Sequence, residues 1–359
     1  MKVVSVVGAR PQFIKSAPLG KALRAAGHLE FLIHTGQHYD YEMSQIFFAE
    51  LGINAPDANL EIGSGSHGWQ TAQMLLGIEE VLLAEKPDQV LVYGDTNSTL
   101  AGALAAAKLG IPVILLEAGL RSFNRAMPEE INRIIVDHLA KLLLCPSQAA
   151  VNNLTAEGIA EGVYLVGDVM ADALAFALKR TGRDSSLLKR LGLTESEYLL
   201  ATVHRAENTD DEARLSNILT ALARVNEPVV FPVHPRTRQR IAELDLPFDM
   251  SSKKCALHLI EPLGYLEMVR LEQSARMILT DSGGVQKEAY WLGVPCLTLR
   301  DETEWIETVE TGWNVLVGSD TECILSAVNS FVSPDEHPLL YGDGHAAERC
   351  VALMEKLSH

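Results

Sequence analysis

Residues 281–284, which read Asp-Ser-Gly-Gly, combine residue types that can bind a phosphate group. They follow a short apolar run and precede a short helical pattern, so a strand, a helix and a second strand are expected over residues 277–299. Asp281 or Ser282 can N-cap this helix. Gly283 and Gly284 carry no side chain that would keep a ligand from the first free N–H groups. These donors and the helix dipole favour an anion.

Glu288 follows one turn further along the same helix. A carboxylate at this position can accept hydrogen bonds from a diol, such as the one that a ribose offers. Gly293 occupies the expected C-cap, and Pro295 beyond it prevents continuation of the helix. The alternative interpretation is a tight turn between a strand and a helix, with Glu288 on the surface, because a lone glycine motif is weak support for binding.

The bulk composition limits the partners that we expect. The chain has 359 residues and a formal net charge of −17, which argues against a nucleic acid or an anionic membrane surface. The five cysteines form no CxxC pair, as expected of a reduced, cytoplasmic protein. Neither a signal peptide nor a membrane span is expected, because the apolar runs are too short.

Apolar runs alternate with helical patterns, which predicts the α/β class with parallel sheets. Strands are expected at residues 3–7, 31–34, 89–92, 112–116, 142–145, 198–203, 229–232, 257–260, 277–280, 294–299 and 313–317. Residues 43–51 are expected to be helical. We expect two Rossmann-like domains that face a central cleft: residues 1–167, joined by a C-terminal helix at about 344–359, and residues 168–343.

Ligands of such sheets bind beyond the carboxyl ends of the strands. In the first half of the chain, these positions and the segments after them hold Arg10, Lys15, Asp95, Glu117, Glu129 and Arg133. In the second half they hold His204, Arg205, His234, Arg236 and residues 282–284. The first half is therefore suited to proton transfer by carboxylates, and the second to holding a diphosphate through charge-assisted hydrogen bonds.

Several of these residues also have a purely structural interpretation. Asp95 could simply N-cap the helix that follows it. Glu129 and Glu130 fall in a first helical turn, where the helix dipole favours acids. By contrast, Glu117 ends an apolar strand, where a carboxylate is costly unless it is paired or functional. No spacing of His, Cys and Asp matches a metal site.

An ordered set of passages resembles the non-hydrolysing UDP-N-acetylglucosamine (UDP-GlcNAc) 2-epimerase family. They are residues 8–15, 35–38, 94–96, 117–121, 128–133, 204–208, 281–288 and 300–301, and they extend through essentially the whole chain. The resemblance implies two Rossmann-like domains, as in the B-type (GT-B) glycosyltransferases, and a homodimer. It implies a reversible inversion at C2 of a UDP-sugar through elimination and re-addition of UDP. No cofactor is expected, because no net oxidation occurs.

The same resemblance assigns roles to individual residues. The catalytic residues would be Asp95, Glu117, Glu129 and His204, and the three acids would carry proton transfer; which of them removes the C2 proton stays open. Ser282, Gly283 and Gly284 would bind phosphate oxygens, and Glu288 the ribose. The other residues expected to contact the substrate are Arg10, Lys15, Arg133, His234 and Arg300.

Several positions depart from the usual family pattern. Ala9 and Gln12 replace a Thr and a Glu, and Trp305 and Ile306 replace an Arg and a Pro in the late motif. These variants resemble a branch that acts on UDP-2,3-diacetamido-2,3-dideoxy-glucuronate, so that sugar is the alternative substrate. Residues 37–45 also differ from the form linked to allosteric activation by UDP-GlcNAc.

Two other classes of function share parts of this pattern. A GT-B glycosyltransferase would have the same fold and nucleotide site, but it should need an acceptor groove, often basic, which this acidic chain lacks. A non-catalytic nucleotide-sugar binder would gain nothing from three carboxylates opposite a diphosphate. The sequence therefore favours the epimerase.

Overall fold

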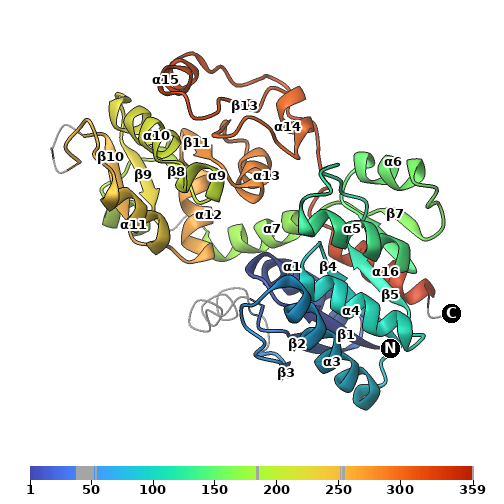
Figure 1. Cartoon of the computed structure of the whole chain (residues 1–359). Helices are drawn as coiled ribbons and strands as arrows, with labels where there is room; N and C mark the ends of the chain where they lie inside the picture. Colours follow the sequence, from blue (N-terminus) through green and yellow to red (C-terminus); the bar gives the residue numbers. More distant parts are fainter. Residues whose placement is uncertain (38–51, 53–54, 183–185, 251, 253–254, 358–359) are drawn as a thin grey trace. The chain divides into compact units, whose positions relative to one another are not determined.

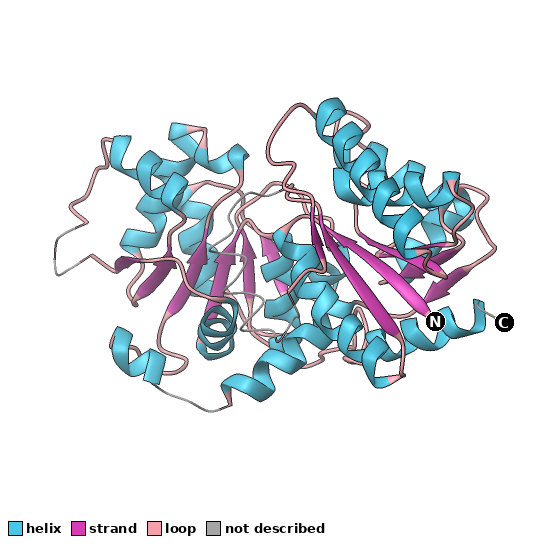
Figure 2. Cartoon of the chain, turned by 90° about the horizontal axis from the view of Figure 1, so that it is seen from below, coloured by secondary structure: helices cyan, strands magenta, loops and turns pink. Residues whose placement is uncertain are grey.

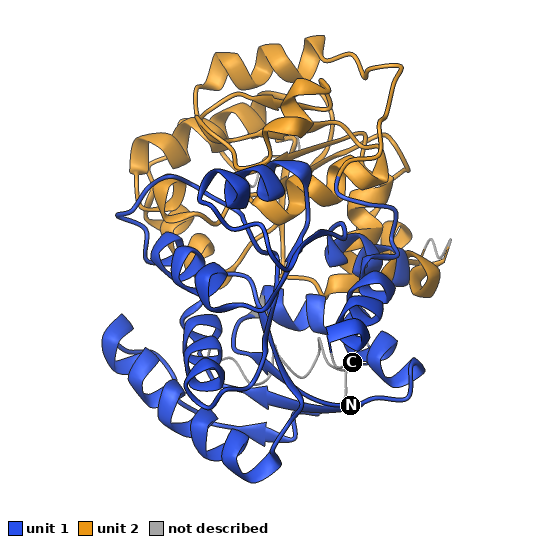
Figure 3. Ribbon diagram, turned by 90° about the vertical axis from the view of Figure 1, so that its right-hand side faces the viewer, with its two compact units in different colours: residues 1–176, 341–359 blue, residues 177–340 orange. Residues whose placement is uncertain are grey.

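The computed structural model describes residues 1–37, 52, 55–182, 186–250, 252 and 255–357 (Figure 1). The helix expected at residues 43–51 lies outside the described residues, as does most of the segment 37–45. The chain divides into two compact units, coloured separately in Figure 3: unit 1 is Met1–Phe176 with Tyr341–His359, and unit 2 is Ala177–Leu340.

Unit 1 contains a parallel sheet of seven strands in the order β3-β2-β1-β4-β5-β6-β7 (Figure 2). In chain order the strands are β1 (Lys2–Val7), β2 (Leu29–His34), β3 (Ala58–Asn59), β4 (Gln89–Tyr93), β5 (Val113–Leu116), β6 (Leu142–Cys145) and β7 (Val163–Leu165). The strand order reverses between β1 and β4, so the turns after these two strands form the topological switch point of the sheet.

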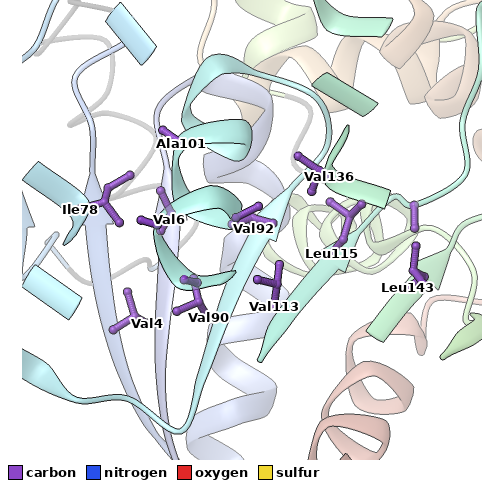
Figure 4. Close-up of a cluster of buried hydrophobic side chains, with 14 of the residues drawn as sticks. Val4, Val6, Ile78, Val90, Val92, Ala101, Val113, Leu115, Val136 and Leu143 are labelled. Carbon is purple, nitrogen blue, oxygen red and sulfur yellow. The ribbon is translucent and has the colours of Figure 1, made fainter. Parts of the chain in front are cut away.

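The helices of unit 1 cover both faces of this sheet. They are α1 (Arg10–Ala25), α3 (His67–Glu85), α4 (Asn97–Lys108), α5 (Pro128–Leu139), α6 (Gln148–Ala156) and the C-terminal α16 (Ala346–Leu357), while α7 (Val169–Thr181) continues into unit 2. Alternate residues of β1 face opposite layers, as the period of a strand requires. Val4 and Val6 pack with Ala101 of α4 (Figure 4), whereas Val3 and Val7 pack with residues of α1 and α16.

Unit 2 repeats this architecture with six parallel strands in the order β10-β9-β8-β11-β12-β13. They are β8 (Leu199–Thr202), β9 (Val229–Pro232), β10 (Leu257–Ile260), β11 (Met277–Thr280), β12 (Cys296–Thr298) and β13 (Asn314–Leu316). The switch point lies between β8 and β11. The predicted class, α/β with two parallel sheets, is confirmed.

The helices of unit 2 are α8 (Ser186–Leu191), α9 (Ala206–Thr209), α10 (Glu212–Arg224), α11 (Pro235–Glu243), α12 (Tyr265–Ser274), α13 (Gly283–Leu292), α14 (Ile306–Glu310) and α15 (Thr321–Ser330). Gly293 ends α13 with a φ of 66°, the left-handed conformation predicted for its C-cap. Among the described residues, no helix is both long and apolar enough to cross a membrane.

Candidate active site

The turn between β1 and α1 is built around Gln12. Its Oε1 accepts the N–H groups of Gly8 (2.7 Å) and Ala9 (3.1 Å), and its Nε2 donates to the carbonyl of Tyr93 (2.7 Å) at the end of β4. Gln12 therefore ties together the ends of the two strands at the switch point. Arg10 begins α1 at this turn, but its side chain lies outside what the structure describes.

Glu117 follows β5 and pairs with Lys15 of α1. Both side chains are largely buried, at 8% and 12% exposed. Burial alone would lower the pKa of Lys15, but the charges of Glu117, Asp168 and Asp95 outweigh it and the pKa is raised. Glu117 has a φ of 64°, which is unusual for a residue with a side chain. The structure thus holds a cation and a carboxylate together at the carboxyl end of the sheet.

Asp95 follows β4 and pairs with Arg133 of α5. Its Oδ2 accepts hydrogen bonds from Nε (3.0 Å) and Nη2 (2.6 Å) of Arg133. The alternative role of Asp95 as a helix cap is wrong, because Thr96 caps α4 by accepting the N–H of Thr99. The Asp95 side chain is 30% exposed, which leaves room for a ligand to reach it.

Glu129 and Glu130 are neighbours in the first turn of α5, but their surroundings differ. Glu130 is 1% exposed and accepts hydrogen bonds from the N–H groups of Ser122 (2.9 Å) and Phe123 (2.9 Å), and from Arg133 Nη1 (2.7 Å). Burial opposes its ionisation, but these donors outweigh burial and lower the pKa of Glu130. Glu129 is half-buried and has no hydrogen-bond or ion-pair partner among the residues that the structure describes.

Unit 1 therefore gathers four carboxylates and two cations around the ends of β4 and β5. The strands β1, β4 and β5 are adjacent in the sheet, which explains how residues far apart in the sequence meet there. Lys15 pairs with one of the carboxylates and Arg133 with two, whereas Glu129 pairs with neither cation. Such a set can bind an anionic group and transfer protons.

In unit 2, the predicted phosphate-binding turn begins α13. Ser282 is the N-cap, and its Oγ accepts the N–H of Val285 (3.5 Å). A Cβ added at Gly284 would have only the Ser282 hydroxyl within 4 Å, at 3.8 Å, so the space in front of Gly284 is open. A Cβ at Gly283 would instead lie 2.9 Å from Nε1 of Trp305. The tip of α13 is thus accessible at one glycine and packed at the other.

Asp281, the other candidate N-cap, has a different role. It is fully buried, and its carboxylate accepts the N–H groups of His204 (3.1 Å) and Arg205 (3.1 Å) and the side-chain amide of Asn208 (3.1 Å). These bonds hold the segment after β8 against the end of β11. His204 Nδ1 lies 3.3 Å from Oδ1 of Asp281, and the His204 side chain is 53% exposed.

Arg300 is nearly buried at the end of β12 and pairs with Glu304. Its Nη1 and Nη2 lie 2.9 Å and 3.1 Å from the two carboxylate oxygens, and Arg205 Nη2 lies 3.6 Å from the same carboxylate. Burial opposes ionisation of Glu304, but Arg300 outweighs burial and the pKa of Glu304 is lowered. The two arginines and Glu304 form a charged group beside Trp305.

Two predicted ligand residues of unit 2 have structural partners. His234 is exposed and N-caps α11, where its Nδ1 accepts the N–H of Arg236 (3.3 Å). Glu288 is 6% exposed and accepts a hydrogen bond from the Tyr265 hydroxyl (3.0 Å). The structure therefore places Glu288 on the inner side of α13, towards α12, where the buried Glu272 acts on it electrostatically.

Sequence reasoning missed several residues that shape these sites. The sequence marks Gln12 only as a departure from the family pattern, and it predicts no role for Glu304 or Glu272. The spacing of Arg300 and Glu304 by four residues was a usable signal for an ion pair. Among the described residues, no group of three or more His, Cys, Asp or Glu side chains could hold a metal ion.

Comparisons with known proteins match the whole chain. Residues 21–355 fit the family model described as UDP-N-acetylglucosamine 2-epimerase. A Methanococcus maripaludis protein named UDP-N-acetylglucosamine 2-epimerase homolog is 54% identical over 99% of this chain and 100% of its own length. The Pseudomonas aeruginosa UDP-2,3-diacetamido-2,3-dideoxy-D-glucuronate 2-epimerase is 48% identical over 99% of this chain and 100% of its own length.

Solved structures agree with this match. The Methanocaldococcus jannaschii UDP-GlcNAc 2-epimerase, crystallised with UDP-GlcNAc and UDP, has a TM-score of 0.87 and 46% identity over 99% of this chain and 100% of its own. A spinosyn rhamnosyltransferase, 16% identical with a TM-score of 0.53 over 99% of this chain and 96% of its own, shares the fold alone. The GT-B-like fold class predicted from the sequence is thereby confirmed.

Proposed function

Because the chain belongs to the UDP-N-acetylglucosamine 2-epimerase family and is a UDP-sugar 2-epimerase, an isomerase, we propose that it interconverts UDP-GlcNAc and UDP-N-acetylmannosamine. In the forward direction a base removes the proton at C2, and the bond from C1 to the diphosphate oxygen breaks. UDP then leaves and a glycal remains. UDP adds back at C1 while a proton is delivered to the opposite face of C2.

The observation that carries this proposal is the ion pairing of the carboxylates in unit 1. Asp95 and Glu117 each have a cation, whereas Glu129 has no described partner. A carboxylate that is not engaged by a cation can contact the substrate directly, so we assign the removal of a proton to Glu129. In this proposal Glu129 removes the C2 proton from one face of the sugar, and Asp95 or Glu117 delivers a proton to the opposite face. Their cations, Lys15 and Arg133, balance the charge.

The groups of unit 2 are proposed to hold UDP. The side chain of Ser282 and the N–H groups of Gly283 and Gly284 suit phosphate oxygens, and the exposed His204 is assigned to the departing diphosphate. The Asp281 carboxylate lies beside Nδ1 of His204, which orients the ring so that its other nitrogen can contact an anion. Arg10, Lys15, Arg133, His234 and Arg300 keep their proposed roles towards the substrate, and Glu288 its role towards the ribose. No cofactor takes part, because the reaction has no net oxidation.

UDP-2,3-diacetamido-2,3-dideoxy-glucuronate is the second candidate substrate. The relative named for that substrate is 48% identical, whereas the Methanocaldococcus jannaschii relative named UDP-N-acetylglucosamine 2-epimerase is 46% identical. Overall identity therefore does not separate the two sugars. Trp305, which lies against Gly283, is one of the departures from the usual family pattern that resemble that branch, and this resemblance supports the second candidate.

Incubation with each sugar nucleotide in D₂O tests the proposal. Inversion of the H2 coupling pattern by NMR, with uptake of one deuterium at C2 and no acceptor present, is the expected result. The sugar with the higher kcat/KM identifies the substrate. Release of free sugar and UDP without inversion, or transfer only when an acceptor is added, would contradict it. The homodimer implied by the resemblance belongs to the same proposal, and sedimentation of the purified protein tests it.

A further inference from the structure

Asp137 lies on the buried face of α5 and contacts the segment that follows Glu117. Its Oδ1 accepts the N–H of Gly119 (3.1 Å), and its Oδ2 lies 2.6 Å from Nη1 of Arg121. The side chains of Asp137 and Arg121 are each 1% exposed. Removal of either partner of such a buried ion pair strongly destabilises the fold, because the remaining charge would be buried without a counter-charge.

Arg121 is held from a second side by α6. Its Nε and Nη2 donate to the two carboxylate oxygens of Glu157 (2.7 Å and 2.6 Å), which is the bidentate arrangement that fixes a guanidinium most firmly. The side-chain amide of Asn153 donates to the carbonyl of Gly119 (3.0 Å). Residues 119–121 are therefore bound both to α5 and to α6.

This segment imposes the backbone of Glu117. Glu117 and Gly119 have φ values of 64° and 79°, and a Cβ at Gly119 would lie 2.4 Å from the carbonyl oxygen of Ala150. The left-handed region is unfavourable for a residue with a side chain, so it persists only where the surroundings enforce it. The contacts of Asp137 with Gly119 and Arg121, two and four residues later, hold the backbone that follows Glu117.

We propose that Asp137 and Arg121 are positioning residues for the epimerase reaction, which hold Glu117 in the left-handed conformation that brings its carboxylate to Lys15. They act through the backbone of residues 117–121. The inference rests on the proposed function, because it requires that Glu117 takes part in turnover. In the sequence, Arg121 belongs to a family-like passage but has no predicted role, and no role is predicted for Asp137 either.

The charges around Asp137 make its pair sensitive to acid. Burial raises the pKa of Asp137 to about 6, although Arg121 and the N–H of Gly119 act in the opposite direction. The other titratable groups that act on this pair are Glu157 on α6 and Cys145 on β6. As the pH falls through about 6, Asp137 therefore gains a proton, and Arg121 then faces a neutral carboxyl group in place of a carboxylate.

The test compares D137N with D172N. Asp172 is a matched control, because it is a buried aspartate of unit 1 that accepts two backbone N–H groups, those of Ala346 (3.1 Å) and Ala347 (3.0 Å), away from Glu117. We expect D137N to lower kcat about 10-fold to 100-fold, as small displacements of a catalytic group do. KM should stay within about threefold, because ground-state binding is not altered. D172N should lower the melting temperature but leave kcat unchanged.

The pH profile and a third variant separate the possible failures. As the pH is lowered, the kcat of the wild type should fall with an inflection near pH 6. The D137N variant should lack that inflection. An unchanged kcat and an unchanged inflection in D137N, together with loss of turnover in E117Q, would overturn the inference and leave the proposed function standing. Full turnover in E117Q would instead refute the proposed role of Glu117.

Should D137N fail to fold, E157Q is the second test. The Glu157 side chain is 31% exposed, so its substitution is tolerated more easily, yet it removes the bidentate partner of Arg121. We expect kcat to fall about threefold to tenfold with KM unchanged. A wild-type kcat in E157Q would overturn the proposal that Arg121 and its partners position Glu117.

Discussion

Nη2 of Arg133 lies 2.6 Å from Oδ2 of Asp95, and this contact joins α5 to the turn after β4. The second terminal nitrogen of the same guanidinium, Nη1, lies 2.7 Å from Glu130. One arginine thus connects a candidate catalytic carboxylate to a carboxylate that holds the neighbouring loop. The planar fork of arginine allows both bonds at once, and a lysine could not reproduce this geometry.

We expect R133Q to lower kcat/KM about 100-fold, because it removes the partner of two carboxylates at once. R133K should recover only part of the loss, since it restores the charge without the fork. The control is R240Q, which removes two exposed ion pairs, with Glu243 and with Asp210, and should leave the kinetics unchanged. Steady-state rates on the better substrate measure the effect, and wild-type kinetics in R133Q would show that Asp95 needs no partner.

Glu129 and Glu130 should respond in opposite ways to the same substitution. E129Q should abolish turnover and deuterium uptake at C2 while the melting temperature stays unchanged, because Glu129 is half-buried and has no described partner. E130Q should destabilise the protein by about 1–3 kcal/mol, because its hydrogen bonds to Ser122, Phe123 and Arg133 depend on a charged acceptor. Equal losses of stability in the two variants would contradict the distinction.

Gly283 and Gly284 form a second matched pair. G284A should leave the melting temperature nearly unchanged, because the space at that position is open, but it should weaken UDP binding about tenfold by obstructing the N–H groups at the helix tip. G283A should lower the melting temperature even without UDP, because its Cβ would displace Trp305. Calorimetric titration with UDP and thermal denaturation separate the two effects. Wild-type UDP affinity in G284A would argue against a phosphate at this turn.

Glu272 should make the stability of unit 2 depend on pH. Burial, and then the charge of Glu288, raise the pKa of Glu272 well above its ordinary value, and its two oxygens have no hydrogen-bond partner in the part of the chain that the structure describes. A carboxyl group with a raised pKa in the folded state supports the fold below its unfolded pKa, and this support is lost as the pH rises through the folded pKa. E272Q stays neutral, so it should become more stable relative to wild type as the pH increases.

Melting temperatures of wild type and E272Q between pH 5 and pH 9 measure this difference. E243Q is the control, because the Glu243 side chain is 52% exposed and its substitution should give no such trend. A constant difference between wild type and E272Q at all pH values would show that Glu272 is ionised throughout. Burial raises the pKa of Tyr198 and of Cys296, so neither neighbour ionises over this pH range and the trend reports on Glu272.

Local patterns in the sequence predicted the elements and the chemistry of their ends. Alternating apolar runs and helical patterns indicated two parallel α/β sheets, and the left-handed Gly293 is where the C-cap was expected. The polar residues after the strands were recognisable because adjacent parallel strands end at one edge of a sheet. These features depend on near neighbours in the chain, so one sequence was enough to predict them.

Tertiary structure decided which of these polar residues are already engaged. Glu129 and Glu130 are indistinguishable by composition and position, yet only Glu130 meets Ser122 and Phe123. Likewise, Asp281 was an equally good N-cap beside Ser282, but it accepts the N–H groups of His204 and Arg205 from the segment after β8. The hydrogen-bond partners in both cases come from other parts of the chain and depend on how loops pack against a helix or a strand. Sequence periodicity carries no information about that packing.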